Sequence, residues 1–171
     1  AVIIEDKSGL KKNSLFKDQS GAKQDSIKNF CKKIKKASDA KTSSDFLVIA
    51  RIESLILNKG MKDALRRADA YSQAGADMIM IHSKNNSPNE ILDFAKKFKK
   101  SNFFKPMVAV PSTYSVIKES TLIKNGFKIV IYANHMLRAA YPAMKNAAKS
   151  ILKNQRSFEL ENKISSVKDV I

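Results

Sequence analysis

Five short apolar runs, separated by segments with helical spacing, constrain the fold of this chain more than any other feature. The runs occupy residues 2–5, 46–52, 77–83, 107–111 and 127–134. Each run is nearly continuously apolar rather than alternating, which is typical of strands that are covered on both faces. Because the segments between them have helical spacing, the sequence predicts an α/β protein with a parallel sheet.

The intervening segments carry the start and stop signals of amphipathic helices. Asp25 is placed to cap the first helix, and Ser87 with Glu90 has the spacing of a capping box. Gly75 and Gly126 stand where helices are expected to end. Pro142 is expected to kink or divide a long helix near the C-terminus. The expected helices lie within residues 25–37, 61–77, 87–100, 116–126, 134–155 and 165–171.

Two architectures fit this order of elements, an open doubly wound sheet and a (β/α)8 barrel. A complete barrel takes roughly 250 residues, whereas this chain has 171. Five βα units would therefore be a barrel without its opening strands. The chain also begins inside an expected strand, which leads us to expect that the front of a larger protein is missing.

The composition is strongly basic, with 32 Lys and Arg against 16 Asp and Glu, a net charge of +16. Most of the cations are lysines on the polar faces of expected helices, so a solvated coat is favoured over a basic nucleic-acid-binding module, which stays an alternative. Hydrophobic residues make up 43% of the chain, enough for one core, and no run approaches the length of a membrane span. The single cysteine, Cys31, favours a reducing, cytoplasmic location.

One connection is unusually long. Residues 6–24 are polar and show no apolar periodicity, whereas βα connections usually have roughly 2–6 residues. A segment of this kind is expected to be a lid or a binding loop, with a disordered insertion as the alternative.

Polar residues at the ends of the expected strands are the candidates for chemistry, because active sites of parallel α/β proteins form there. Glu5 could hold Mg²⁺ directly or through water, and Arg51 offers a planar set of donors for phosphoryl or carboxylate oxygens. His82 could donate to a phosphoryl oxygen. Each has a structural alternative: Arg51 and Glu53 could pair with each other, and His82 could be a structural histidine. Asn134 and His135 are expected at the end of the fifth strand.

Several motifs give the chain a family resemblance. Glu5-Asp6-Lys7 followed by Lys11-Lys12-Asn13-Ser14-Leu15 resembles the EDK…KxNSL segment of phosphoenolpyruvate mutases, which belong to the isocitrate lyase and phosphoenolpyruvate mutase superfamily. The resemblance continues in order through residues 48–54, 62–84, 108–114, 129–140 and 161–171. It thus covers essentially the whole chain.

The resemblance implies a (β/α)8 TIM-type barrel, of which residues 1–171 would be the C-terminal five βα units of one catalytic domain, with the first three strands absent. It implies an isomerase that interconverts phosphoenolpyruvate and 3-phosphonopyruvate with Mg²⁺, the first step of phosphonate biosynthesis. It also implies a gating loop at 6–24 and a homotetramer, a dimer of dimers, in which C-terminal helices from 134–171 are exchanged between subunits.

The resemblance assigns roles to single residues. Glu5 would belong to the magnesium shell, through water. The catalytic residues would be Lys11, Asn13, Arg51 and His82, and the substrate-binding residues would be Asn13, Ser14, Leu15, Arg51 and His82.

The same loop separates this chain from its relatives. The carbon–carbon lyases of the superfamily carry a cysteine there, which this loop lacks, and phosphonopyruvate hydrolase tends to have Thr-Ser where this chain has Asn13-Ser14. Asn13 therefore favours the mutase over the hydrolase. The family's metal-binding aspartates precede the matched region, so the segment alone is expected to be inactive unless the first three βα units are supplied in cis or in trans.

Overall fold

The computed structural model describes residues 1–9, 12–16 and 18–170. They form two compact units, residues 1–132 and residues 133–171, which are described separately. In the described part of the chain, no helix is long and apolar enough to cross a membrane.

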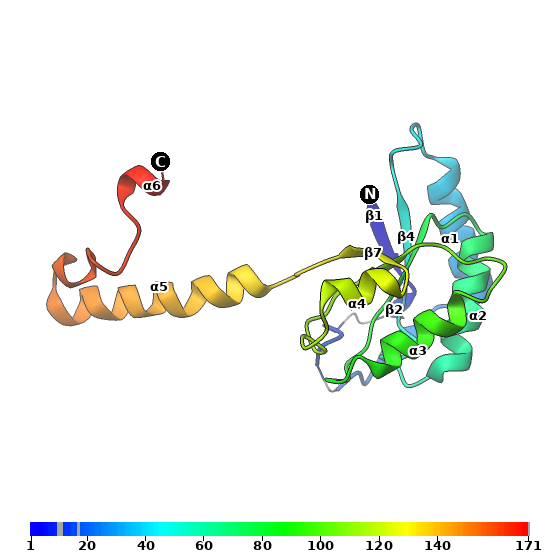
Figure 1. The fold of residues 1–171 in the computed structure, drawn as a ribbon, viewed down its shortest axis with the longest axis horizontal. Coiled ribbons are helices and arrows are strands. Elements are labelled where there is room, and N and C mark those ends of the chain that lie inside the picture. Colours follow the sequence, from blue (N-terminus) through cyan, green and yellow to red (C-terminus); the bar gives the residue numbers. More distant parts are fainter. Residues whose placement is uncertain (10–11, 17, 171) are drawn as a thin grey trace. The chain divides into compact units, whose positions relative to one another are not determined.

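The first unit is built on a five-stranded parallel sheet, as predicted (Figure 1). The strand order is β1-β4-β5-β6-β7, and every neighbouring pair is parallel. The strands are shorter than the apolar runs that predicted them. They are β1 (Val2–Glu5), β4 (Val48–Ile52), β5 (Met78–Ile81), β6 (Met107–Ala109) and β7 (Phe127–Val130).

Four helices follow strands in the order that the sequence predicts. They are α1 (Ile27–Asp39), α2 (Gly60–Gln73), α3 (Asn89–Phe98) and α4 (Glu119–Lys124). Their buried residues pack with one set of strand residues, which includes Ala50, Ile79 and Ala109. This main core explains why the strands read as continuous apolar runs on that side.

The other face of the sheet carries a smaller apolar cluster made by strand residues. Ile49, Met78, Met80 and Val108 are buried there, packed with partly buried apolar residues in or next to β4, β6 and β7. Because the four helices of the first unit, α1–α4, pack on the opposite face, the described part of this unit has helices on one side of the sheet. That is the arrangement of a barrel wall and differs from a doubly wound sheet, which carries helices on both faces.

The long β1–α1 connection, residues 6–24, contains regular structure that the sequence analysis did not anticipate. β2 (Lys7–Gly9) and β3 (Ala22–Gln24) pair as an antiparallel ribbon. The expectation of a lid or binding loop stays a prediction, and the ribbon occupies the two ends of the segment. The pattern was missed because a ribbon of three residues per strand is held by backbone hydrogen bonds and needs no alternating apolar residues.

Two predicted helix starts are also corrected. Ser26 caps α1, because its Oγ accepts a hydrogen bond from the N–H of Asn29 at 3.1 Å, while Asp25 lies one residue outside. The capping box of Ser87 and Glu90 does not form, since the Glu90 carboxylate accepts hydrogen bonds from Ser83 and Asn85 instead.

The predicted helix ends agree better with the structure. Gly75 and Gly126 have φ of 106° and 93° and follow the last turns of α2 and α4. α4 begins at Glu119, later than the apolar spacing suggested.

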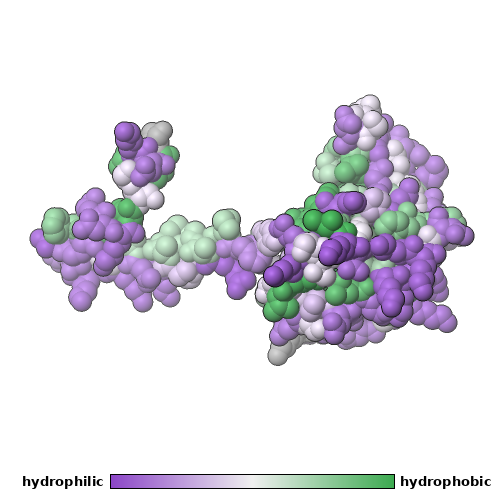
Figure 2. Space-filling model, in the orientation of Figure 1, coloured by the Kyte–Doolittle hydropathy of each residue, from purple (hydrophilic) through white to green (hydrophobic). Residues whose placement is uncertain are grey.

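The second unit contains α5 (His135–Asn154), the 3₁₀ turn η1 (Phe158–Leu160) and α6 (Val167–Val170). Pro142 lies inside α5 and does not divide it. Leu160 is buried, but many large apolar side chains of this unit are exposed (Figure 2). They include Met136, Leu137, Tyr141 and Leu152 on α5.

Candidate functional site

The carboxyl ends of β1, β4 and β5 bring three predicted site residues to one face of the sheet. Glu5 is paired in register with Arg51, and Arg51 with Met80, which belongs to the smaller apolar cluster. His82 follows β5 directly and, two residues beyond Met80, falls on the same face. Glu5, Arg51 and His82 therefore share the face opposite the helices.

Arg51 is the centre of the polar contacts on this face. Its Nε lies 2.7 Å from Oε1 of Glu53 and 3.6 Å from Oε2 of Glu5. Its Nη2 donates to Oγ of Ser14 at 2.8 Å. The Arg51–Glu53 pair, considered as an alternative to ligand binding, is therefore present, and it holds the guanidinium on the side where the loop arrives.

A buried ion pair lies beside Arg51. Nζ of Lys7 is 3.0 Å from Oε2 of Glu53, and the two side chains are 1% and 0% exposed. Burial raises the pKa of Glu53, but Arg51, Ser14 and Lys7 outweigh it and lower that pKa below its usual value. Glu53 is therefore an ionised carboxylate that neutralises part of the charge of two cations.

His82 is buried next to this cluster. It is 5% exposed, and burial, followed by the charge of Arg51, lowers the pKa of His82 to about 4. Among the described residues, its Nδ1 has no hydrogen-bond partner. A neutral imidazole with an unused ring nitrogen can bind an oxygen of a ligand.

Of the predicted loop residues Asn13 and Ser14, only Ser14 contacts the Arg51 cluster. Ser14 is buried against Arg51 and Glu53, whereas Asn13 is exposed and its Oδ1 accepts a hydrogen bond from the N–H of Leu15 at 2.9 Å. The Asn13 side chain thus closes a turn of the loop, one residue away from the arginine contact. Lys11, a predicted catalytic residue, lies outside the described residues.

Asn134 and His135 are not at the end of the fifth strand. β7 ends at Val130, and both residues belong to the second unit, where Asn134 precedes the first turn of α5. The apolar run was extended too far because Ile131 and Tyr132 follow the strand without a polar break.

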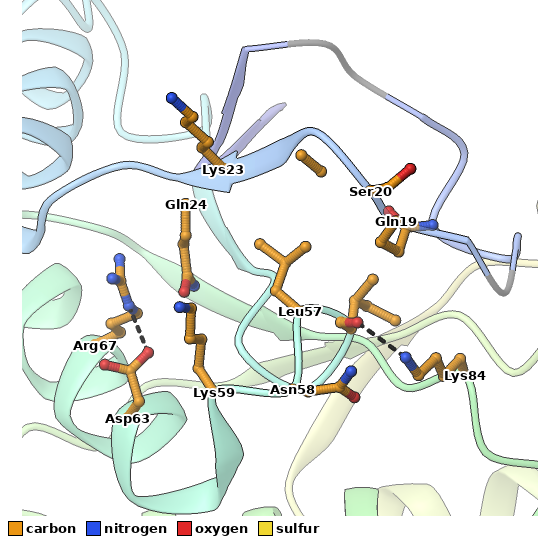
Figure 3. Close-up of a pocket in the computed structure, with 12 residues that line it drawn as sticks. Gln19, Ser20, Lys23, Gln24, Leu57, Asn58, Lys59, Asp63, Arg67 and Lys84 are labelled. Carbon is orange, nitrogen blue, oxygen red and sulfur yellow. Dashed lines mark hydrogen bonds and ion pairs between the residues drawn. The ribbon is translucent and has the colours of Figure 1, made fainter.

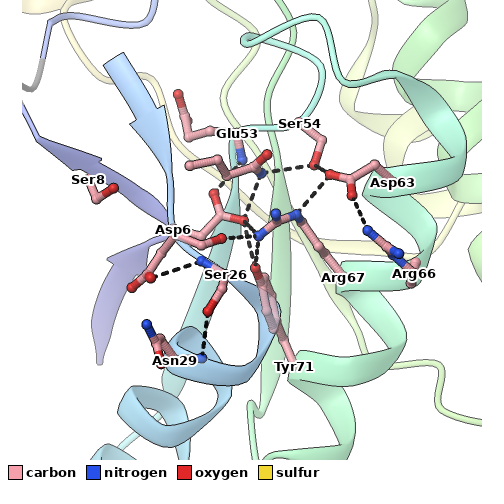
Figure 4. Close-up of polar contacts among 12 residues, drawn as sticks. Asp6, Ser8, Ser26, Asn29, Glu53, Ser54, Asp63, Arg66, Arg67 and Tyr71 are labelled. Atoms are coloured by element: carbon pink, nitrogen blue, oxygen red, sulfur yellow. Dashed lines mark hydrogen bonds and ion pairs between the residues drawn. The ribbon is translucent and has the colours of Figure 1, made fainter. Parts of the chain in front are cut away.

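A second buried network, centred on Asp6, was missed by the sequence analysis (Figure 4). Asp6 is 0% exposed, and its Oδ2 accepts hydrogen bonds from Tyr71 at 2.8 Å and Gln24 at 2.9 Å and lies 3.2 Å from Nη1 of Arg67. Its Oδ1 accepts from the N–H of Glu53 at 2.9 Å. Burial raises the pKa of Asp6, although these partners oppose the change.

This network ties the two ends of the β1–α1 loop to each other. The carbonyl of Asp6 accepts from the N–H of Asp25 at 2.7 Å, and the Asp25 carbonyl accepts from Arg67 at 2.8 Å. Arg67 is held in turn by Asp63 at 2.8 Å on α2. The loop therefore begins and ends at one fixed point beside β4 and α2.

Residues that the structure describes line two pockets in this region. The larger, of about 700 Å³, is lined by the end of the loop, the segment after β4 and Lys84 (Figure 3). The smaller, of about 360 Å³, is lined by Ile3, Ile4, Glu5, Arg51 and Met80. Since Glu5 and Arg51 line the smaller pocket and do not line the larger one, we assign the candidate site to the smaller pocket.

A complete metal site is not formed by the described residues. Among them, no group of three or more His, Cys, Asp and Glu side chains is placed to hold a metal ion. Glu5 is a half-buried carboxylate, 19% exposed, that lines the smaller pocket. It fits the role of a single ligand, direct or through water, for a cation that keeps other ligands.

A family model described as phosphoenolpyruvate phosphomutase matches residues 1–152. The chain belongs to this family. The family recognised from the motifs is thereby confirmed.

Individual relatives include two activities. The phosphoenolpyruvate phosphomutase of Tetrahymena pyriformis is 38% identical over 169 residues, which is 99% of this chain and 55% of the relative. The phosphonopyruvate hydrolase of Variovorax sp. (strain Pal2) is 39% identical over 176 residues, 100% of this chain and 58% of the relative. The chain thus spans about half the length of the curated relatives that it matches.

Solved structures confirm the fold of the family. The phosphoenolpyruvate phosphomutase of Streptomyces platensis subsp. rosaceus superposes with a TM-score of 0.89 at 40% identity, covering 98% of this chain and 57% of that one. A phosphonopyruvate hydrolase in complex with oxalate and Mg²⁺ superposes with a TM-score of 0.85 at 36% identity, covering 99% and 56%.

Proposed function

We propose that this protein is the C-terminal part of a phosphoenolpyruvate mutase, which interconverts phosphoenolpyruvate and 3-phosphonopyruvate in the first step of phosphonate biosynthesis. The observation that carries the proposal is the hydrogen bond from Arg51 to Ser14 at 2.8 Å. It joins the loop that contains Asn13 to the strand ends that carry Arg51 and His82. Family membership supplies the reaction class.

Phosphoryl transfer passes through a loose, metaphosphate-like state, so the protein has to hold the phosphoryl oxygens and exclude water. Arg51 would bind these oxygens, with its Nε held in place by Glu53 at 2.7 Å. His82, kept neutral by burial, would donate to one of them. Asn13, together with Lys11, Ser14 and Leu15, would complete the enclosure from the loop.

Mg²⁺ is part of the proposal, with Glu5 as a ligand through water. The cation would offset negative charge on the substrate oxygens. Glu5 alone cannot bind it in a complete shell, because Mg²⁺ takes six oxygen ligands. The remaining protein ligands would come from the three βα units that we propose precede residue 1, in cis or in trans. The 171-residue chain alone should therefore be inactive.

Phosphonopyruvate hydrolase is the second candidate, because a hydrolase is as similar to this chain as the phosphomutases are. Asn13 favours the mutase. A carbon–carbon lyase is disfavoured because the chain's cysteine lies on α1, where burial raises the pKa of Cys31 and makes it a poor acid.

The second unit supports a proposal about assembly. Its exposed apolar side chains would be covered if helices of residues 134–171 were exchanged between subunits in a dimer of dimers. We place the enzyme in the cytoplasm, where the single cysteine stays reduced.

Turnover of the completed barrel tests the function. The chain would be joined to the part of the Tetrahymena pyriformis phosphomutase that precedes the matched region, and products would be followed by ³¹P NMR. Asn13→Ala and Arg51→Ala should each lower turnover by roughly 10²-fold or more, the scale of one preorganised donor.

Two exposed residues supply matched controls. Asn89→Ala and Arg66→Ala change the same residue types away from the strand ends and should keep the parent rate. Formation of phosphoenolpyruvate from phosphonopyruvate identifies a mutase, whereas release of inorganic phosphate and pyruvate identifies a hydrolase. Near-parent turnover of Asn13→Ala or Arg51→Ala would remove that residue from the mechanism.

A further inference from the structure

We propose that the side chains of Lys7, Ser14 and Glu53 form a latch that holds the β1–α1 loop on the carboxyl end of β4. In this proposal the Ser14 hydroxyl is a positioning group. It serves the reaction by fixing the loop, and contacts between this part of the loop and the substrate are left to the backbone and to Asn13. The inference rests on the proposed function for its catalytic consequence, but not for the latch itself.

The hydroxyl of Ser14 has no bonding capacity left for a ligand. A hydroxyl offers one proton and two lone pairs. Ser14 Oγ donates to Oε2 of Glu53 at 2.7 Å and accepts from Nζ of Lys7 at 2.9 Å and from Nη2 of Arg51 at 2.8 Å. All three positions are filled, and Ser14 is only 5% exposed. A substrate oxygen could reach this hydroxyl only by displacing one of these partners.

The buried ammonium group of Lys7 donates hydrogen bonds to several residues of the loop. Besides Ser14, its ammonium group donates to the carbonyl of Lys12 at 3.0 Å and to Oε1 of Gln19 at 3.2 Å, and it lies 3.0 Å from Oε2 of Glu53. The acceptors on the loop extend from Lys12 to Gln19. A single buried cation therefore organises the described part of the loop and anchors it to β4.

The arrangement indicates a role in conformation rather than in raw stability. A buried ion pair often stabilises a fold no better than apolar side chains of the same size, but it fixes one geometry. Here Ser14 is the loop residue that joins the Lys7–Glu53 pair to Arg51, which would bind the substrate. Removing its hydroxyl breaks the direct hydrogen bonds from the loop to Glu53 and Arg51 and leaves the pairs Lys7–Glu53 and Arg51–Glu53 in place.

Proteolysis of the loop tests the latch without any ligand. Phe16 is 62% exposed on the loop and is a chymotrypsin site. Cleavage after it requires local opening, so its rate reports how well the loop is held. Ser14→Ala should raise this rate about tenfold, because hydrogen bonds to two cations and a carboxylate are lost. Ser20→Ala, an exposed serine on the same loop, is the control and should change the rate by less than about twofold.

Lys7→Met is the second variant, and its far-UV circular dichroism shows whether it folds. It should raise the cleavage rate at least as much as Ser14→Ala does. The double variant should be cleaved little faster than Lys7→Met alone, since both substitutions disrupt the same latch. Unchanged cleavage in a folded Lys7→Met and in Ser14→Ala would overturn the latch.

Turnover in the completed barrel separates this inference from the proposed function. Ser14→Ala should both lower the turnover and raise the rate of chymotrypsin cleavage. Loss of turnover with the parent cleavage rate would show that the hydroxyl touches the substrate, which overturns the latch. A parent enzyme without mutase activity would refute the proposed function, while the cleavage result would still decide the latch.

Discussion

Acidification should destabilise the first unit because His82 is buried as a neutral imidazole. In the unfolded chain this histidine has a pKa near 6.5, whereas burial and then the charge of Arg51 lower the pKa of His82 to about 4 in the folded chain. Between these values the unfolded chain binds a proton that the folded chain does not bind. The contribution of His82 to stability is therefore complete above pH 6.5 and is lost as the pH falls towards 4.

The size of the effect follows from the two pKa values. Each unit between them corresponds to about 1.36 kcal/mol, so the free energy of unfolding should fall by about 3 kcal/mol from pH 7 to pH 4 through His82 alone. With His82 only 5% exposed, solvent screening reduces this value little.

Urea unfolding at several pH values measures the effect. The chain has no tryptophan, so the near-ultraviolet signal of the buried Tyr71 and Tyr114 would report on the first unit. Other carboxylates also titrate in this range, and Asp6 and Glu53 have pKa values moved in opposite directions. The informative quantity is therefore the difference between the parent and His82→Gln, which should shrink by about 3 kcal/mol between pH 7 and pH 4.

A direct titration provides the refutation. His82 and His135 are the two histidines of the chain, so His135→Gln leaves one imidazole signal in the NMR spectrum. If this signal titrates near pH 6.5, the environment that we describe for His82 is wrong, and the acid sensitivity must come from other groups.

Two further substitutions test the fold around the loop. Tyr71→Phe removes the hydroxyl that donates to Asp6 at 2.8 Å and accepts from Arg67 at 2.7 Å, and it should lower the free energy of unfolding by about 2 kcal/mol in urea titrations. Tyr132→Phe, which loses an exposed hydrogen bond to Glu119, should cost much less, and equal losses would mean that the Asp6 network adds nothing. Gly75→Ala should lower the melting temperature more than Gly60→Ala. Both glycines have positive φ, a conformation that costs alanine about 1–2 kcal/mol. Only at Gly75 would the new Cβ also lie 2.9 Å from Oγ of Ser38. Equal melting temperatures for the two variants would show that the Ser38 side chain moves away from the new Cβ without a cost in stability.

The strands and the candidate residues Glu5, Arg51 and His82 could be predicted because their signals are local. A continuous apolar run predicts a covered strand, and the residues that follow it fall at the edge where parallel strands end. The helix starts were less certain, since Asp25 and Ser26 are adjacent and both are good caps, and only the backbone geometry decides between them.

The buried polar groups could not be predicted from the pattern. In a chain so rich in lysine, Lys7 looks like one more surface cation, and Asp6 looks like part of a polar loop. Their burial depends on partners far along the chain, Glu53 for Lys7 and Tyr71 for Asp6. Contacts between residues so distant in sequence arise from the fold as a whole, which no local spacing encodes.

The charges at the candidate site agree with the proposal that further units complete the enzyme. Glu5 and Glu53 offset the formal charges of Lys7 and Arg51, and His82 is neutral, so these five groups carry no net charge. The proposed substrate, with a phosphonate and a carboxylate, would bring several negative charges into this place. The basic surface can steer such an anion towards the protein, but screening by salt limits its effect inside the site. We infer that the compensating charge has to come from Mg²⁺ and from groups on the proposed preceding units, with Glu5 directed towards that cation and Arg51 towards the phosphoryl group.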